Sequence, residues 1–179
     1  INTFFDNRES SLSNGIGDDF ILFKDLSSNR HMLMAFDLDT ILGRGDTPGS
    51  PTAGLFKATE PAQASGHLTK PDQVARFLKH PAFVPRYFAE LQRQAETVFS
   101  DAQFPAMVEQ AIGKWTDKSE TDRLNQFAAE RRDFILSQIP RALILSTSLP
   151  LKQGLPVSET PLVNLEGQAD AIATRAVTI

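Results

Sequence analysis

The stretch Met32-Leu-Met-Ala-Phe-Asp-Leu-Asp-Thr40 decides the fold of this 179-residue chain. Its first five residues form an apolar run that predicts a strand buried in a sheet, because such a run can satisfy its backbone only beside other strands. Asp37 then emerges at the end of the strand, where a charged side chain can meet a ligand without full desolvation. Asp39 follows one residue later, and we expect this pair to bind a divalent cation.

Two readings of the pair Asp37 and Asp39 are open. In a strand, residues two apart point to the same side, so the two carboxylates would repel each other without a cation or hydrogen-bond donors between them. The alternative is that they cap turns, which is the interpretation we favour for Asp46 in Gly45-Asp-Thr-Pro48. The repulsion argument favours a metal site for Asp37 and Asp39.

Upstream, a second short strand is predicted over Phe20–Phe23, with turn-forming residues between the two strands. The resulting hairpin would bring the acidic loop before it close to the carboxylates after it. That loop supplies Asp6 as a base or hydroxyl-orienting group, and a first metal ligand from Asn14, Asp18 or Asp19. Asp37 and Asp39 would hold a second metal, an arrangement suited to phosphoryl transfer because Mg²⁺ bridges phosphates and needs few protein ligands.

Downstream of a long loop over residues 47–70, the pattern becomes helical. Helices are expected from Pro71, over 84–98, from Pro105 to Gly113, and from a capping box at Ser119-Glu-Thr-Asp122 to Pro140. In the last helix Arg131 lies on the apolar stripe and is expected to pair with a buried acid. Trp115 is expected to pack between helices.

Composition limits the function classes. The net charge of −4 and the absence of clustered Lys and Arg argue against nucleic-acid binding. No apolar stretch approaches the ~20 residues of a membrane span, and the lack of cysteine excludes disulfides and thiolate metal sites. The three histidines are scattered, which disfavours a zinc site. The chain starts without Met, and we expect it to be a piece of a longer protein.

Three segments together resemble the CotH kinase family, whose members have an atypical protein-kinase-like fold. They are Asp6-Asn-Arg-Glu9, Gly15-Ile-Gly-Asp-Asp-Phe-Ile-Leu-Phe23 and Phe36-Asp-Leu-Asp-Thr-Ile-Leu-Gly43. In that family a segment ending Asn-Asn-Tyr-Tyr-Leu-Tyr leads through a hairpin into Pro-Trp-Asp-Leu-Asp. The resemblance covers roughly Ile1 to Pro140 and is closest to large multidomain bacterial members.

The resemblance implies ATP-dependent phosphorylation of secreted or surface proteins with Mg²⁺ or Mn²⁺, the spore-coat members giving the family its name. It places Asp37 in the metal-binding role, with Asp39 and Asp19, and Asp6 in the catalytic-loop role, while Asn14 and Asp18 would contact the nucleotide side. The expected partners are a nucleotide, a protein substrate and the N-terminal lobe of the same polypeptide, which this chain lacks. Without that lobe the chain alone is expected to be inactive.

We therefore expect an α+β fold of the kinase C-lobe type, with a small β-hairpin and a mainly helical subdomain over 1–142. A linker over 143–161 and the start of a β-rich domain over 162–179 should follow. Two alternatives stay open. The chain could be a structural or adhesive surface module whose acidic loops bind Ca²⁺, or a pseudokinase-like interaction scaffold.

Overall fold

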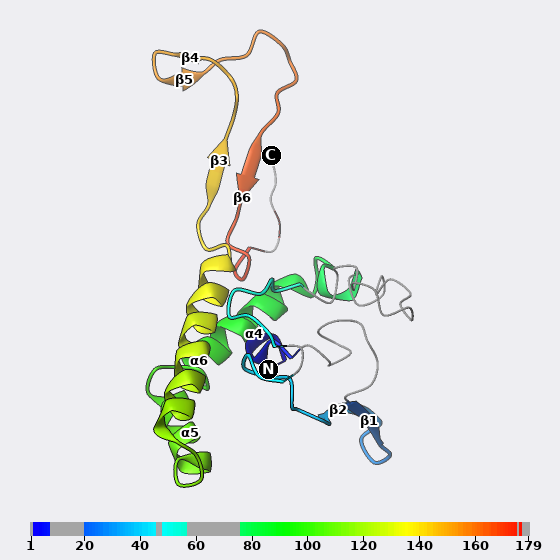
Figure 1. Ribbon diagram of the computed structural model, residues 1–179. Helices are drawn as coiled ribbons and strands as arrows, with labels where there is room; N and C mark the ends of the chain where they lie inside the picture. The colour runs from blue at the N-terminus through cyan, green and yellow to red at the C-terminus, as the bar shows by residue number, and fades with distance from the viewer. Residues whose placement is uncertain (1, 8–19, 46–47, 57–75, 175, 177–179) are drawn as a thin grey trace, which may run out of the picture.

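The computed structural model describes residues 2–7, 20–45, 48–56, 76–174 and 176. The chain is α+β, and its long helix α6 runs beside α4 and α5, with a β-hairpin on one side and a β-arm beyond the end of α6 (Figure 1). The helices are α1 (Asn2–Phe5), α4 (Val84–Glu96), α5 (Gln103–Ile112) and α6 (Lys118–Gln138). The strands are β1 (Phe20–Asp25), β2 (Arg30–Ala35), β3 (Ile144–Ser146), β4 (Leu151–Lys152), β5 (Leu155–Pro156) and β6 (Glu166–Gln168).

Stacked phenylalanines form the centre of the helical body. The ring of Phe4 in α1 lies 4.2 Å from that of Phe99, and Phe99 lies 5.3 Å from Phe104 at the start of α5. Phe4 is fully buried although α1 is only four residues long. An isolated helix of that length is not stable in water, so α1 is held by these tertiary contacts.

The helices predicted after residue 83 are confirmed, but their ends differ: α4 ends at Glu96 and not at Val98, and α5 starts at Gln103, two residues before Pro105. Helix α6 starts at Lys118, after Asp117, and Asp117 makes no side-chain cap hydrogen bond, so the predicted capping box at Ser119 is wrong. The helix ends just before Pro140, as expected, because proline disfavours helical backbone in the residue before it. Trp115, in the turn before α6, is 86% exposed, so the expectation that it packs between helices is also wrong.

The hairpin between β1 and β2 is antiparallel, with Ile21 opposite Met34 and Phe23 opposite Met32. The strands were predicted correctly, but their burial was not. Met32 is 51% exposed and Met34 50%, because this sheet has only two strands and no further layer of described residues covers it. Apolar composition gives the strand its β-propensity, whereas burial needs a neighbouring layer, and the described residues supply none.

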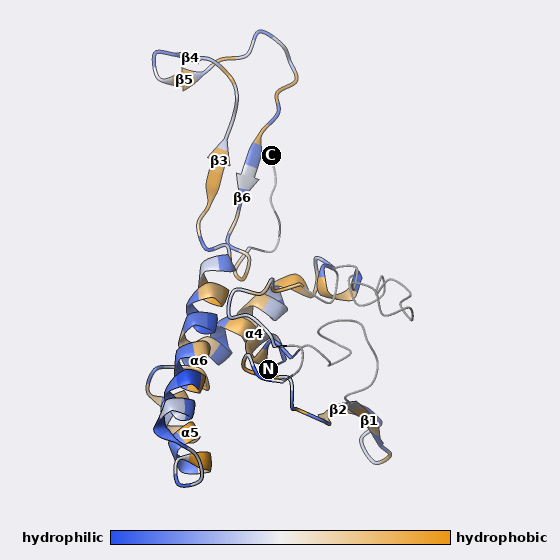
Figure 2. Cartoon of the chain, viewed as in Figure 1, coloured by the Kyte–Doolittle hydropathy of each residue, from blue (hydrophilic) through white to orange (hydrophobic). Residues whose placement is uncertain are grey.

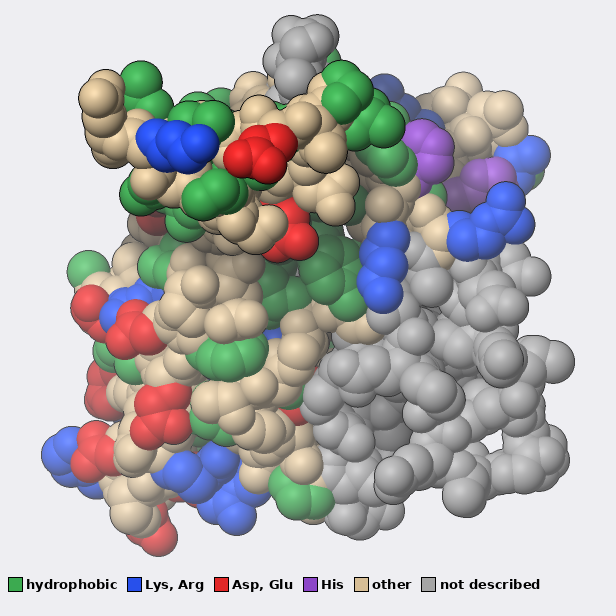
Figure 3. All heavy atoms as spheres, turned by 90° about the horizontal axis from the view of Figure 1, so that it is seen from above, with side chains coloured by type: hydrophobic (Ala, Val, Ile, Leu, Met, Phe, Trp, Pro, Cys, Tyr) green, Lys and Arg blue, Asp and Glu red, His purple; other side chains and the backbone are tan. Residues whose placement is uncertain are grey.

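The C-terminal arm is a narrow ribbon. Strand β3 pairs with β6 and encloses the smaller β4–β5 hairpin, so the segment predicted as a linker contributes three strands. All residues of these strands are exposed, although β3 is apolar (Figure 2). Figure 3 views the molecule from above. On the described part of this upper face, hydrophobic side chains lie among polar ones. At its base Ala171 N–H donates to Pro140 O (2.9 Å), and Arg141 binds Asp170 (3.0 Å).

The described helices include none that is both long enough and apolar enough to cross a membrane.

Candidate functional site

The two carboxylates predicted as metal ligands stand in the segment that follows β2. This strand ends at Ala35, so strand alternation does not determine how Asp37 and Asp39 point, which corrects the argument from sequence. Asp37 has a left-handed backbone, with φ of 48°. Both side chains are exposed, and within the described residues neither carboxylate accepts a hydrogen bond or joins an ion pair. Their oxygens are therefore available to a cation.

The next residues attach this acidic segment to the helical body. Thr40 is fully buried, and Leu42, 8% exposed, donates its N–H to the carbonyl of Phe5 at 2.8 Å. The carbonyl of Leu42 in turn accepts from Arg123 Nη1 of α6, also at 2.8 Å. Leu42 has φ of 53°, a conformation that costs a branched residue energy and persists only when its surroundings impose it. The segment is thus fixed to both α1 and α6.

Gly43 is required at its position by both backbone and space. Its φ is 72°, and a Cβ there would lie 3.0 Å from Cε2 of Phe127 on α6. A larger residue would be strained and would also push Phe127 or the segment away. The close approach of Gly43 to α6 brings the chain after Asp39 down onto the helix.

Asp6, predicted as the catalytic carboxylate, lies just beyond the end of α1. It has φ of 43° and is 4% exposed, and its Oδ2 accepts the N–H of Ser50 at 2.7 Å. Gly49 packs against it so closely that a Cβ on Gly49 would lie 2.7 Å from the Asp6 carbonyl oxygen. Asp6 is therefore a fixed, buried carboxylate next to the attachment point of the acidic segment.

Arg131 of α6 holds the surroundings of Asp6. Arg131 is 1% exposed, and its guanidinium donates from Nε and Nη2 to Thr3 O, at 2.9 and 2.8 Å. Its Nη1 donates to Pro51 O at 3.0 Å and also to Ala53 O. Burial lowers the pKa of Arg131, and the charge of Asp6 opposes that shift. The predicted pairing with a buried acid is thus a charge interaction, added to hydrogen bonds that run to backbone carbonyls.

A second polar network surrounds Glu120, near the start of α6 and one turn before Arg123. Glu120 accepts hydrogen bonds from Arg123 and from Arg44, which follows Gly43. These hydrogen bonds, with that of Arg123 the larger influence, lower the pKa of Glu120 to about 2. Arg44, Glu120 and Arg123 therefore tie the end of the acidic segment to the start of α6.

The structure brings Asp6 and the segment after Asp39 onto one helical platform. Asn14, Asp18 and Asp19 lie outside the described residues. No group of three or more His, Cys, Asp or Glu suited to a metal occurs within the described part of the chain. Asp37 and Asp39 could supply the protein ligands of a Mg²⁺ that is also held by substrate phosphates, since that ion usually keeps several waters and takes only one or two carboxylates from the protein.

Several residues that build this region were not predicted from sequence. Ser50 donates its own backbone N–H to the Asp6 carboxylate, and Arg123 donates to the Leu42 carbonyl. Both contacts join segments far apart in the chain, which no local pattern reveals. A signal did exist for Arg131, because an arginine on an apolar helical stripe must find partners when it is buried. Another part of the chain approaches closely at each of Gly43, Gly45 and Gly49. A glycine in the sequence does not show which segment lies next to it.

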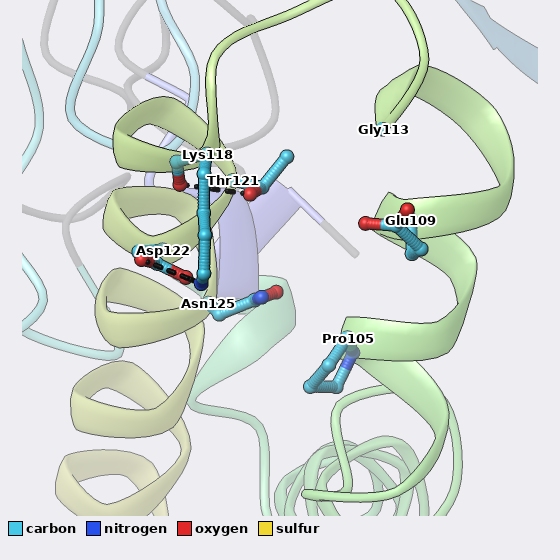
Figure 4. Close-up of a pocket in the computed structure, with 7 residues that line it drawn as sticks. All are labelled: Pro105, Glu109, Gly113, Lys118, Thr121, Asp122 and Asn125. Atoms are coloured by element: carbon cyan, nitrogen blue, oxygen red, sulfur yellow. Dashed lines mark hydrogen bonds and ion pairs between the residues drawn. The ribbon is translucent and has the colours of Figure 1, made fainter.

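A separate cleft lies between α5 and α6 and contains none of the predicted residues. It measures about 390 Å³, and Glu109 points across it toward Thr121 and Asn125 (Figure 4). Lys118 does not reach across, because it lies along α6 and pairs with Asp122 at 2.6 Å. Among the described residues this leaves Glu109 as the unpaired charge at the cleft, because the other acid lining it, Asp122, pairs with Lys118.

Comparisons with family models, with curated proteins and with solved structures find no match to this chain.

Proposed function

We propose that this chain is part of an ATP- and Mg²⁺-dependent protein kinase of the CotH type, which transfers phosphoryl to Ser or Thr of secreted or surface proteins. The observation that carries the proposal is that the carboxylates of Asp37 and Asp39 are exposed and have no partner among the described residues. They lie at the end of a segment locked to α1 and α6. Free acceptor oxygens on a rigid support are what a metal-binding catalytic site needs.

Backbone strain supports the same location. Positive φ is uncommon for residues other than glycine. Among the described residues, Asn29 and Gln153 have it in hairpin turns, whereas Asp6, Asp37 and Leu42 have it outside such turns. Each such residue costs of order 1–3 kcal/mol, and such strain concentrates at functional sites. The three residues lie on the two segments joined by the Leu42–Phe5 hydrogen bond, as expected if their shared geometry were selected for chemistry.

The proposed roles follow the resemblance described above. Asp37 and Asp39, with Asp19, would hold Mg²⁺, which supplies charge neutralisation for the phosphates when bound. Asn14 and Asp18 would lie on the nucleotide side. In the transfer, the bond from the γ-phosphorus to the β-γ bridging oxygen breaks and a bond to the acceptor hydroxyl forms. Asp6 would orient that hydroxyl and take its proton.

Asp6 supports the proposal less than Asp37 and Asp39 do. An orienting carboxylate must come within hydrogen-bond distance of the acceptor hydroxyl. At 4% exposure Asp6 offers almost no surface to a substrate, and Ser50 N–H already binds one of its oxygens. The metal carboxylates are accordingly the first residues to test.

Radiolabelled ATP transfer by the longest natural polypeptide that carries this chain tests the proposal. We expect Mg²⁺-dependent labelling of a protein, and at least a hundredfold loss in Asp37→Asn, because removing a metal ligand withdraws electrostatic stabilisation of the transition state. Asp122→Asn is the matched control, an exposed aspartate on α6 whose partner is Lys118. Equal labelling by wild type and Asp37→Asn would contradict the metal assignment.

Metal binding can be measured without any reaction. Mn²⁺ added to the chain should broaden the amide NMR signals of residues 37–40 before those of α4, because a paramagnetic ion acts over short distances. Broadening that is absent from residues 37–40 would remove the metal site. Stabilisation by Ca²⁺ together with no phosphoryl transfer would instead support the structural, calcium-binding alternative.

A further inference from the structure

We propose that Arg131 is a positioning residue that sets the place of the Asp6 carboxylate. The inference concerns the same site as the proposed function, and its kinetic test rests on that function. Asp6 has φ of 43°, a conformation that persists only when the surrounding structure imposes it.

One guanidinium holds both segments that meet at Asp6. On one side it binds Thr3 O, the carbonyl of α1 three residues before Asp6. On the other it binds Pro51 O and Ala53 O, immediately after Ser50, whose N–H holds the Asp6 carboxylate. The planar fork of arginine can serve several carbonyls at once, whereas the ammonium of lysine is a compact point charge on a flexible stem.

Steric contact completes the arrangement. Gly49 leaves no space between the loop and Asp6, since a Cβ on Gly49 would lie 2.9 Å from the Asp6 Cβ. The loop that Arg131 fixes is therefore in direct contact with Asp6 on two adjacent residues, Gly49 and Ser50. A shift of the loop must move the carboxylate.

The variants Arg131→Lys and Gly49→Ala disturb Asp6 by independent routes. The first keeps the charge but loses the fork, and the second leaves Arg131 intact and displaces Asp6 by contact. Arg132→Lys is the matched control, because the neighbouring arginine binds the surface residues Asp101 and Asp133. Gly49→Ala shows whether a displaced loop moves Asp6, whereas Arg131→Lys tests the guanidinium itself.

The direct readout is hydrogen exchange of the Ser50 amide, taken relative to the amide of Ala95 in the core to correct for global stability. We expect at least a tenfold loss of relative protection in Arg131→Lys and Gly49→Ala and none in Arg132→Lys. Unchanged relative protection of Ser50 in Arg131→Lys and Gly49→Ala would overturn the inference.

The kinetic readout is phosphoryl transfer by the longest natural polypeptide that carries this chain. We expect kcat to fall about 10²-fold in Arg131→Lys, the loss typical of an ångström-scale misplacement, with the KM for ATP unchanged because the role proposed for Asp6 concerns the acceptor hydroxyl and not the nucleotide. An unchanged kcat in a variant that has lost Ser50 protection would overturn the catalytic role proposed for Asp6. A wild-type protein that transfers no phosphate would overturn the proposed function instead, while Ser50 exchange would still decide the role of Arg131.

Discussion

The helical body and the β1–β2 hairpin use apolar residues to different effect. In the body Phe4 is fully buried in a stack with Phe99, while in the hairpin Phe23 is 48% exposed. The hairpin nevertheless leads directly into Asp37 and Asp39. The difference shows that the candidate metal ligands owe their position to the anchored segment after them, from Thr40 to Gly43, and not to packing of the strand before them.

The largest expected effect on stability is that of a substitution in the helical body. Phe4→Ala should lower the free energy of unfolding by about 3–5 kcal/mol, the usual cost of removing a buried aromatic ring. Urea denaturation of the chain measures it. A loss below about 1 kcal/mol would mean that α1 does not belong to the stable core, and the contrast with the hairpin would disappear.

Gly43→Ala tests the junction between the two regions. We expect a loss of about 1–3 kcal/mol, because alanine is strained at φ of 72° and its Cβ would press on Phe127. The control is Gly154→Ala in the β4–β5 turn, which has φ of 81° but nothing within 4 Å of the added Cβ. Equal losses in the two variants would show that backbone strain alone, and not contact with α6, fixes Gly43.

The Glu120 network should make a pH-dependent contribution of under about 1 kcal/mol, since its partners are partly exposed. The pKa of Glu120 is lowered from 4.5 to about 2. Its stabilisation is therefore present above about pH 4.5 and is lost as the pH falls toward 2.

Unfolding of wild type and Glu120→Gln, measured from pH 7 to pH 2, tests this sign. The two stability curves should differ near neutral pH and converge in acid. Glu130→Gln is the control, because Glu130 binds only the neutral Gln126 among its hydrogen-bonding partners in the described chain. A difference between wild type and Glu120→Gln that stays constant down to pH 2 would contradict the assignment.

The smallest effect is expected in the hairpin. Phe23→Ala should change the stability of the chain by no more than about 0.5 kcal/mol, because a half-exposed side chain on a two-stranded sheet loses little on truncation. The same urea experiment serves as the measurement. A loss approaching that of Phe4→Ala would show that a layer outside the described residues covers this face.

Local patterns were enough to predict much of the fold. Apolar periodicity located α4 and the body of α6, Gly113 marked the end of α5, Pro140 marked the end of α6, and turn formers located the hairpin. The same patterns misplaced the start of α6 at Ser119. They also took the run Met32–Phe36 to be buried, because alternation and hydrophobicity describe a strand without describing what covers it.

The candidate site was predictable only in part. Asp6, Asp37 and Asp39 were chosen from charge, spacing and resemblance, and the structure places Asp6 beside the segment that follows the other two. Its burial was not predictable, because it results from Gly49 and Ser50, more than forty residues away in the chain.

The sequence by itself determined the helices, the hairpin and the clustering of carboxylates after it, because these depend on interactions between residues close along the chain. Only the tertiary structure decided that Arg131 and Arg123 of α6 hold α1, the loop at Ser50 and the segment at Leu42 together. The physical reason is that an arginine can satisfy any backbone carbonyl within its reach. Nothing in the local sequence identifies which carbonyl the folded chain brings to it.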